Sequence, residues 1–364
     1  MGFPVSACAT AVVLLLWCGA SAAAEADGEP DPPGSWGVVP LPLLSYAPET
    51  ELVLGGMAGG YVKSETPKTH DTTFLALAAI STKGQAIFGG GLDAHLLRDQ
   101  MLVGVELMLR RFPDTFYGVG NDTPLSAAED FSSDDFSYEL RPMVRAANHL
   151  YFGVVKHVWF SRVREREPGG LLASDAVTGA SGGRSMGVGV AGTYDSRDNT
   201  INATQGVYVL AKATTYRREL GSQFDFGAYL LDARTYLSPG PGHVIALNAF
   251  VDARSGDAPF YQLAQLGGRN KLRGHYEGRY RDELLGLIQT EYRFPIVGIL
   301  SGVAFGGVGD VAEKVDDFLS HGLKYSAGGG ARVLLDPKGR VNAAVDFGYA
   351  GDQTGLYVSL GEAF

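Results

Sequence analysis

Apolar and polar residues alternate along most of this chain, in short segments that are separated by turn-forming residues. In residues 340–349, for example, Val345 and Phe347 share one parity, whereas Asn342 and Asp346 share the other. Successive side chains of a β-strand point to opposite faces, so a period of two predicts strands with one apolar and one polar face. The pattern therefore predicts an all-β protein.

Fifteen segments between about Thr50 and the last residue show this alternation. They are residues 50–63, 72–83, 85–96, 100–112, 131–146, 148–163, 184–195, 206–217, 222–236, 242–252, 283–295, 298–311, 322–335, 340–349 and 354–364. Single-chain barrels of bacterial membranes have an even number of strands. We therefore predict a transmembrane antiparallel β-barrel of sixteen strands, with the unrecognised strand in residues 113–130 or 164–183.

The alternation alone does not show which face of each strand points inwards. A soluble β-sandwich or lipocalin-type barrel would place the apolar face inside, whereas a membrane barrel places it towards lipid. So long a series of consecutive hairpins exceeds the few strands of a typical soluble sheet, which favours the membrane barrel. After the first residues, no apolar stretch is long enough for a transmembrane helix.

The N-terminal residues 1–24 have the composition of a secretory signal peptide. An apolar run from Ala11 to Trp17 leads to small residues that end at Ala24. This run is shorter than the roughly 20 apolar residues that span a bilayer, which favours cleavage over a short N-terminal anchor. We therefore expect export to the bacterial outer membrane.

The residues that follow the predicted signal peptide differ in composition from the rest of the chain. Residues 25–49 are rich in Pro and Gly, which favours a periplasmic lead-in tether, and the barrel domain is then expected to cover residues 50–364. Both cysteines, Cys8 and Cys18, lie in the predicted signal peptide. The mature chain would therefore have no thiol and no disulfide.

Composition and motif spacing restrict the chemistry further. The formal net charge of −10 and the pI near 5.2 argue against a nucleic-acid partner, which would require a basic face. No histidine has a neighbour at metal-ligand spacing, and no phosphate-binding loop occurs, so we predict no metal and no cofactor. Residues 179–183 match the hydrolase pattern G-x-S-x-G, but no helix is predicted after them, so we expect no enzyme activity and no catalytic residue.

Four parts of the sequence carry further motifs. The segment LGGRNKLRGHYEGRYRD, residues 266–282, contains a glycine pair and an Arg-Gly-His-Tyr tip, with Gly267, Gly268, Arg273, Gly274 and Tyr276. The segment LIQTEYRFPI, residues 287–296, follows it and has Glu291 on its polar face. FYGVGND (116–122) and YDSRDNTINATQGVYV (194–209) are rich in turn-forming residues. The chain ends on TGLYVSLGEAF, with Leu356, Val358, Leu360 and Phe364 in one parity.

Together these motifs resemble the bacterial surface antigen family, the barrel of BamA- and TamA-type outer-membrane proteins. The resemblance implies that residues 266–282 form a long extracellular loop that folds into the lumen, where Glu291 accepts hydrogen bonds from Arg273. A guanidinium drawn into a lumen needs a carboxylate in bidentate geometry, which supports this pairing physically. The resemblance also implies that the C-terminal residues are a signal for insertion, although Glu362 interrupts their apolar face.

Two features depart from the family pattern. In AFGGVGDV, residues 304–311, this chain has Gly307 where the family usually carries Asp. We therefore expect the loop arginine to have one carboxylate partner instead of two. The residues before the predicted barrel leave no room for POTRA domains, so the resemblance covers the barrel and not the part that delivers substrates.

The leading functional hypothesis is a barrel-only member of this family that assists outer-membrane biogenesis, by insertion or transport of protein or lipid. The resemblance implies weak pairing of the first and last strands, so that the seam opens sideways into lipid. The expected partners are outer-membrane lipid, lipopolysaccharide and a separate periplasmic protein, and the barrel is expected to be monomeric. A passive solute channel and a structural surface protein are the alternatives.

Overall fold

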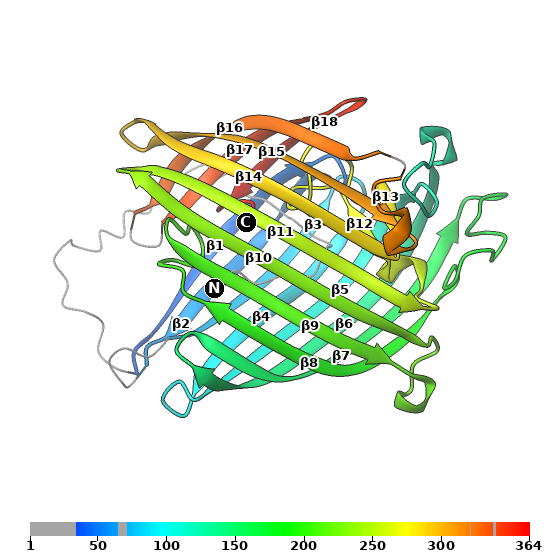
Figure 1. Ribbon diagram of the computed structural model, residues 1–364, viewed down its shortest axis with the longest axis horizontal. Coiled ribbons are helices and arrows are strands. Elements are labelled where there is room, and N and C mark those ends of the chain that lie inside the picture. Colours follow the sequence, from blue (N-terminus) through cyan, green and yellow to red (C-terminus); the bar gives the residue numbers. More distant parts are fainter. Residues whose placement is uncertain (1–33, 65–70, 321, 338–339) are drawn as a thin grey trace.

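The computed structural model describes residues 34–64, 71–320, 322–337 and 340–364. Among these residues, sixteen strands close into one antiparallel barrel, in which the last strand returns to pair with the first (Figure 1). The predicted fold class and strand number are therefore confirmed. The predicted signal peptide, residues 1–24, lies outside the described residues.

The secondary structure consists almost entirely of strands. The barrel is built, in chain order, from β1 (Trp36–Ala47), β2 (Glu51–Val62), β3 (Thr72–Ser81), β4 (Ala86–Leu96), β5 (Met101–Phe116), β6 (Glu129–Ala147), β7 (Leu150–Arg166), β8 (Gly182–Asp195), β9 (Gly206–Tyr216), β10 (Phe226–Gly240), β11 (His243–Gly256), β14 (Leu284–Val297), β15 (Leu300–Ala312), β16 (Lys324–Asp336), β17 (Val341–Ala350) and β18 (Gln353–Leu360). A separate two-stranded sheet, β12 (Ala264–Leu266) and β13 (Tyr280–Asp282), lies in the loop between β11 and β14. Short 3-10 helices occur at Leu125–Ala127, Arg218–Leu220, Phe260–Gln262 and Val315–Asp317. No helix within the described ranges is long and apolar enough to cross a membrane.

All fifteen predicted segments overlap barrel strands, but the sixteenth strand is not where we predicted it. It is β1, which occupies residues 36–47 of the predicted lead-in tether, 25–49. Residues 113–130 and 164–183 contain no additional barrel strand. The barrel therefore begins at Trp36 instead of residue 50, and the tether prediction is wrong for the residues that form β1.

The proline content that concealed β1 is compatible with its position at the seam of the barrel. In the described chain, β1 pairs with β18 at a single position, Tyr46 with Val358. By contrast, β1 and β2 form twelve register pairs, which run through Pro40 and Pro42. Proline has no backbone N–H to donate and is therefore found on edge strands. The seam gives β1 this edge character on its β18 side.

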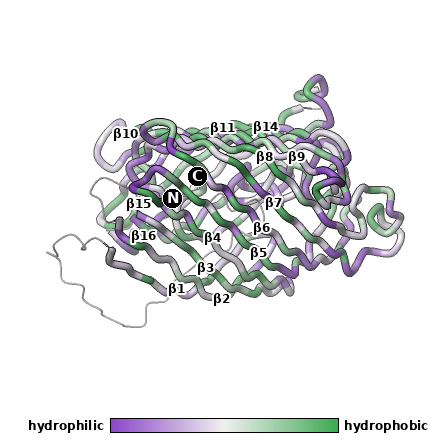
Figure 2. The backbone as a smooth tube through the Cα atoms, turned by 90° about the horizontal axis from the view of Figure 1, so that it is seen from below, coloured by the Kyte–Doolittle hydropathy of each residue, from purple (hydrophilic) through white to green (hydrophobic). Residues whose placement is uncertain are grey.

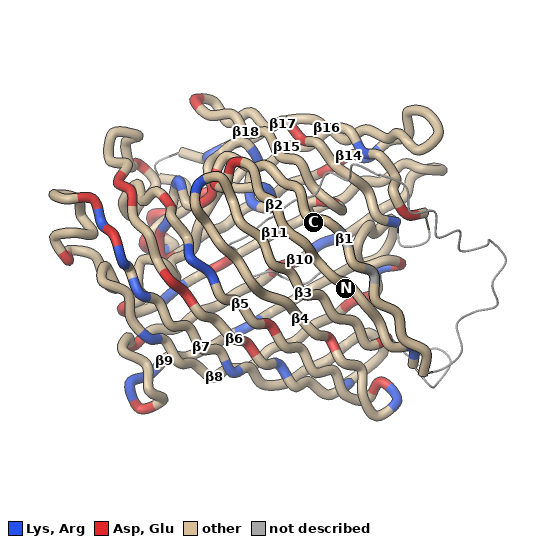
Figure 3. Tube along the Cα trace, turned by 180° about the vertical axis from the view of Figure 1, so that it is seen from behind, with Lys and Arg blue, Asp and Glu red and all other residues tan. Residues whose placement is uncertain are grey.

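The two faces of the strands differ in chemistry, as the alternation predicts. Side chains of one parity are apolar and exposed on the outer wall, such as Ile288 and Phe347. Side chains of the other parity, such as Glu291 and Asp346, are buried inside. Figure 2 shows this as alternating hydrophobic and hydrophilic colours along the strands, and Figure 3 shows many charged residues towards the end with the long loops. The charged face therefore lines the lumen, and the apolar face meets the lipid.

Lys156 interrupts the apolar outer face on β7. Its neighbours of the same parity, Val154 and Phe160, are exposed hydrophobic residues, and Lys156 is itself exposed. A lysine on the lipid face of a barrel costs about 2–4 kcal/mol at the bilayer midplane and about 0–1 kcal/mol near the interfaces.

We expect Lys156→Leu to raise the free energy of unfolding by up to about 2 kcal/mol, because it removes a charge from the lipid-facing wall. Urea titration of the barrel in lipid vesicles would measure this change. The matched control is Lys212→Leu, which removes a lumenal ammonium 3.0 Å from both carboxylate oxygens of Glu139 and should destabilise the barrel. A Lys156→Leu barrel that is less stable than wild type would contradict a lipid-facing position.

Candidate functional site

The loop between β11 and β14, residues 257–283, packs against the inner wall of the barrel. Figure 1 shows its sheet, β12 and β13, at the same end as the loops that follow β5 and β7. Leu266 and Leu272 of this loop are fully buried against Leu285 of β14 and Val311 of β15. Burial of these apolar side chains stabilises the loop inside the lumen.

Glycines determine how the loop folds back on itself. Gly267 has a φ of +111°, and a Cβ there would lie 2.0 Å from the carbonyl oxygen of Tyr276. Gly268 has a φ of +79°, and its N–H donates to the carbonyl of His275 at 2.9 Å. Any larger residue at position 267 would separate the two arms of the loop. The glycine pair therefore allows the loop to turn back, so that its tip reaches β14 and β17 on the inner wall.

Arg273, at this tip, lies between two carboxylates. Its Nη1 donates to Asp346 of β17 at 2.6 Å, and its Nη2 donates to Glu291 of β14. The guanidinium carbon lies 3.5 Å from the centre of the Phe305 ring, in a cation–π contact. Only 2% of Arg273 is exposed. The expectation of a single carboxylate partner is therefore wrong.

Gly307 has a different role from the acidic residue that the family carries at this position. A Cβ at Gly307 would lie 2.7 Å from the Leu272 side chain and 2.7 Å from Cβ of Gln289. The missing side chain makes room for Leu272, next to the arginine. The second carboxylate comes instead from Asp346, which the alternation had placed on the polar face without pairing it with Arg273.

Asp346 is close to the loop because its neighbour on β17, Gly348, has no side chain that would keep the loop tip away. A Cβ at Gly348 would lie 2.6 Å from the carbonyl carbon and oxygen of Arg273. Gly274, with a φ of +116°, donates its N–H to the Tyr357 hydroxyl of β18 at 3.0 Å. The loop tip therefore docks directly on the last two strands.

Further ion pairs extend this contact into a network. Arg293 of β14 donates to Glu291 at 2.9 Å, and Arg332 of β16 donates to both Asp346 and Glu362. With Arg273, three guanidinium groups meet three carboxylates, so the buried charges compensate one another. Sequence reasoning missed Arg293, Arg332 and Glu362 as members of this network, although each belongs to a polar parity or to the tail.

A fourth arginine, Arg269 of the loop, lies beside this network and has no carboxylate partner among the described residues. Nη2 of Arg269 donates to the carbonyl of Gly361 at 2.8 Å. Burial lowers the pKa of Arg269 to about 10, because the charged form is poorly solvated there. A backbone carbonyl thus orients this guanidinium towards the C-terminal tail.

The four C-terminal residues predicted to share one face do not all do so. Leu356 is exposed on the outer wall, but β18 ends at Leu360, which packs beside Leu43 of β1. The tail then turns inwards at Gly361, with a φ of +70°. Phe364 is buried in the lumen, where it packs in a cluster with Ala203, Tyr236, Ala246 and Ala363. The interruption by Glu362 is explained by its lumenal ion pairs, and the role of the segment in insertion stays a prediction.

The two turn-rich motifs contact opposite ends of the site. In residues 116–122, the N–H of Gly120 donates to the carbonyl of Arg281 in the loop at 2.8 Å, and Asn121 donates to Asp310 of β15. In residues 194–209, the carbonyl of Ala203 accepts a hydrogen bond from Arg293 at 3.2 Å. Both motifs therefore support the lumenal loop or the ionic network.

The loop tip also bridges the seam of the barrel. The N–H of Tyr276 donates to Gln353 at the start of β18 at 3.1 Å. The next N–H, of Glu277, donates to Glu49 in the turn after β1 at 2.7 Å. Two consecutive amides thus hold the two sides of the seam. Burial, and next the carboxylate of Glu277, raise the pKa of Glu49 to about 8, and Asp114 acts in the same direction.

We expect Arg273→Ala to undock the loop and lower the free energy of unfolding by up to about 3–5 kcal/mol, the cost of breaking a buried ion pair. The loss of stability would be smaller than this limit because Glu291 keeps its ion pair with Arg293, and Asp346 keeps its ion pair with Arg332. Limited proteolysis of the loop and urea titration measure the two effects.

The control for this variant is Arg218→Ala. Arg218 forms an exposed ion pair with Asp225, so its loss should change stability by less than about 1 kcal/mol. Arg273→Lys keeps the positive charge but loses the planar guanidinium that binds two carboxylates. Its free energy of unfolding should therefore lie between those of Arg273→Ala and Arg218→Ala. Wild-type protease resistance in Arg273→Ala would contradict the ionic docking of the loop.

Docking of the tip is expected to weaken as pH rises from about 5 to about 8. The pKa of Glu49 is raised to about 8 from 4.5 in the docked state, so an undocked, solvated Glu49 loses its proton first. The stabilisation is fully present below pH 4.5 and is lost as pH approaches 8. The rate of loop proteolysis, measured across this range with a protease of flat pH profile, should therefore increase with pH.

Glu49→Gln stays neutral and keeps an oxygen that accepts the N–H of Glu277, so its proteolysis rate should change less than that of the wild type over the same range. Burial also raises the pKa of Glu277, which retains part of the pH dependence. Glu313→Gln, which alters an exposed carboxylate paired with Lys314, should retain the wild-type pH dependence. An identical pH profile for Glu49→Gln and wild type would rule out Glu49 as the titrating group.

Comparisons with known proteins agree with this architecture. The Omp85 superfamily domain matches residues 161–364. Among solved structures, BamA from Haemophilus ducreyi lacking POTRA domains 1-3 has a TM-score of 0.62 at 13% identity, over 90% of this chain and 70% of that chain. CdiB from Acinetobacter baumannii has a TM-score of 0.56 at 10% identity, over 89% of this chain and 59% of that chain. CdiB from Escherichia coli has a TM-score of 0.56 at 11% identity, over 91% of this chain and 63% of that chain.

At these identities the structural likenesses show the fold alone, and the chain spans about three fifths of the length of the CdiB chains. No curated protein matches the sequence. The predicted resemblance to BamA-type barrels is confirmed, and a barrel of this kind implies the bacterial outer membrane. With a domain match that covers more than half of its residues, the chain belongs to the Omp85 superfamily.

Proposed function

We propose that this protein assists the insertion or transport of protein or lipid at the outer membrane, by opening its barrel between β1 and β18. The observation that carries the proposal is the seam, where the described strands pair only at Tyr46 and Val358. The proposal assigns no catalytic step to the chain.

The energetic argument compares the seam with other interfaces of the barrel. The β3–β4 and β17–β18 interfaces each have eight register pairs, whereas the seam in the described chain has one. Each backbone group left unpaired in hydrocarbon costs several kcal/mol, so the barrel opens most readily where fewest pairs break. The exposed strand edges would then offer N–H and C=O groups to an incoming strand, by β-augmentation.

The lumenal loop supports this proposal because it controls the same seam. Its amides at Tyr276 and Glu277 bind Gln353 on one side and Glu49 on the other. Release of either contact would remove the bridge across the seam. In the described chain, β1 and β18 would then be joined by the pairing of Tyr46 with Val358. The ionic network around Arg273 would keep the β14–β17 wall rigid while the seam moves. We further propose that a separate periplasmic protein delivers the substrate.

A passive solute channel is less consistent with the interior. The loop and its ion pairs occupy the lumen beside β14–β17, and a lumenal cavity next to them has a volume of about 460 Å³. Charged side chains of opposite sign line this cavity, including Glu139, Lys212, Asp232 and Arg234. A pore for solutes would need a continuous aqueous path instead.

The test is a reversible covalent lock across the seam. A disulfide between Tyr46→Cys and Val358→Cys should abolish activity, because β1 and β18 could no longer separate. Activity is measured as the recovery of outer-membrane protein and lipopolysaccharide levels in cells depleted of the native chain, and a reductant should restore it. The matched control joins Val345→Cys to the same Val358→Cys, across β17–β18, and should remain active when oxidised.

Two results would contradict the proposal. One is full recovery with the oxidised seam lock. The other is depletion of the chain that leaves membrane-protein and lipid levels unchanged. A large, steady conductance in planar bilayers that Arg273→Ala does not alter would instead favour the passive channel.

A further inference from the structure

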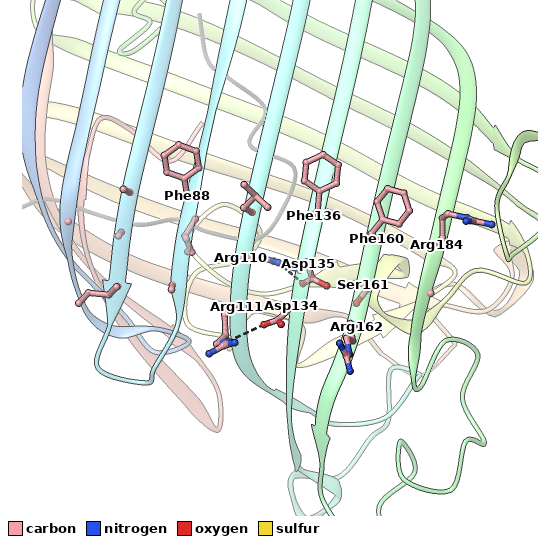
Figure 4. Close-up of a pocket in the computed structure, with 18 of the residues that line it drawn as sticks. Phe88, Arg110, Arg111, Asp134, Asp135, Phe136, Phe160, Ser161, Arg162 and Arg184 are labelled. Carbon is pink, nitrogen blue, oxygen red and sulfur yellow. Dashed lines mark hydrogen bonds and ion pairs between the residues drawn. The ribbon is translucent and has the colours of Figure 1, made fainter.

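A groove on the outer wall, whose nearest edge lies on β2 beside the seam strand β1, is not used by the proposed function. It has a volume of about 1170 Å³ and extends across β2 to β8, near the ends of the strands that lead to the long loops. Its floor is apolar and is formed by the exposed side chains of Leu54, Ile80, Phe88, Leu109 and Phe160, with the partly exposed Phe136 among them. Figure 4 shows Phe88 of β4, Phe136 of β6 and Phe160 of β7 projecting in one row.

Arginines border this floor on its loop side. Arg111 lies two residues beyond Leu109 on β5, and Arg162 lies two residues beyond Phe160 on β7, so each shares the outward parity of the apolar residue. Two residues of a strand span roughly 7 Å. Arg184 of β8 completes the rim (Figure 4). The wall therefore changes from apolar to cationic over the distance that separates an acyl chain from its headgroup.

The rim has more positive than negative charge, although the whole chain has a net charge of −10. Asp134 compensates part of it, since it accepts hydrogen bonds from Arg111 at 3.0 Å and from Arg164. The side chain of Arg162 forms no hydrogen bond or ion pair with any residue that the structure describes, and the side chain of Arg184 donates to the carbonyl of Gly221 at 2.6 Å. An anion would therefore complement this rim.

The inner side of the same strands does not supply that anion. Asp135, which also borders the groove, accepts a hydrogen bond from Arg110 at 2.8 Å, and both side chains are nearly buried. In Figure 4 this pair lies behind the strands, whereas Arg111 and Arg162 extend along the outer wall. The charge of Asp135 is thus already compensated on the lumenal side, and Arg162 and Arg184 of the outer rim are left for a ligand.

The position of the groove defines which membrane leaflet it meets. Its strands lead to the loops 117–128 and 167–181, whereas the opposite ends of β6–β7 and β10–β11 are joined by the short turns 148–149 and 241–242. Outer-membrane barrels have short periplasmic turns and longer extracellular loops. The groove therefore faces the outer leaflet, with its arginines at the level of the headgroups.

We propose that this groove binds a phosphorylated acyl lipid of the outer leaflet, of the lipid A class. Its acyl chains lie on the apolar floor, and a phosphate accepts charge-assisted hydrogen bonds from Arg162 and Arg184. Guanidinium groups match phosphate oxygens in a planar, bidentate geometry, which makes arginine well suited to this rim. Because the arginines lie on β5, β7 and β8, bound lipid would hold the wall fixed in the membrane while the seam between β1 and β18 moves.

The proposal is tested by native mass spectrometry of the delipidated, refolded barrel with bis-phosphorylated lipid A as the probe. The wild-type barrel should bind this probe more tightly than the dephosphorylated form. Combined Arg162→Gln and Arg184→Gln substitutions should weaken binding roughly tenfold or more, because two charge-assisted contacts are lost. Inorganic phosphate at the same concentration should not displace the lipid, since it lacks the acyl chains.

The matched control combines Arg217→Gln and Arg218→Gln, which remove the same charge from the same end of the barrel outside the groove. This control should bind lipid A like the wild type. Phe160→Ser should weaken binding of both lipid forms, because it alters the apolar floor. Heat-dependent gel migration checks that every variant is folded.

Three results would overturn the proposal: equal binding by the groove variant and the control variant, equal binding of phosphorylated and dephosphorylated lipid, or a dimer of the chain that covers the groove and excludes lipid. None of these results bears on the seam lock, so failure of the lipid site and failure of the proposed function are distinguishable.

Discussion

In the hydrocarbon core of a membrane, a backbone N–H or C=O group without a partner costs several kcal/mol. The architecture of this protein follows from that constraint. Sixteen described strands satisfy their neighbours around a closed barrel, and the largest deficit is concentrated at the seam, where Tyr46 and Val358 form the single pair. Pro40 and Pro42 fit there because an edge strand does not need every donor. The cost of unpaired backbone groups therefore explains both why the barrel closes and why it opens most readily at the seam.

The interior meets a second constraint, which is that buried charges need partners. Arg273 enters the lumen from the loop and is balanced by Glu291 and Asp346, which are in turn shared with Arg293 and Arg332. Such a network adds little net stability over apolar packing, but removal of one member leaves another charge uncompensated. The network therefore specifies one position for the loop. From that position, consecutive amides of the tip reach both sides of the seam.

The ionic network of the lumenal loop and the outer groove lie on different strands of the barrel. The loop contacts β14 to β18 and the turn after β1, next to the seam. The basic and apolar groove lies on β2 to β8, away from the ionic network. A wall held by lipid on one side and a weakly paired seam on the other would allow one part of the barrel to move against a fixed part.

Alternation by itself determined the faces of the strands, because side-chain direction in a strand depends only on local geometry. It placed Glu291 and Asp346 on the polar face, and the family resemblance, not the alternation, indicated that residues 266–282 fold into the lumen. It did not find β1, since prolines are acceptable only where a strand lacks a full partner, and that depends on where the barrel closes. Nor did it pair Arg273 with Asp346 or turn Phe364 into the lumen. These contacts join residues far apart in the chain, so register and closure decided them, and only the tertiary structure contains that information.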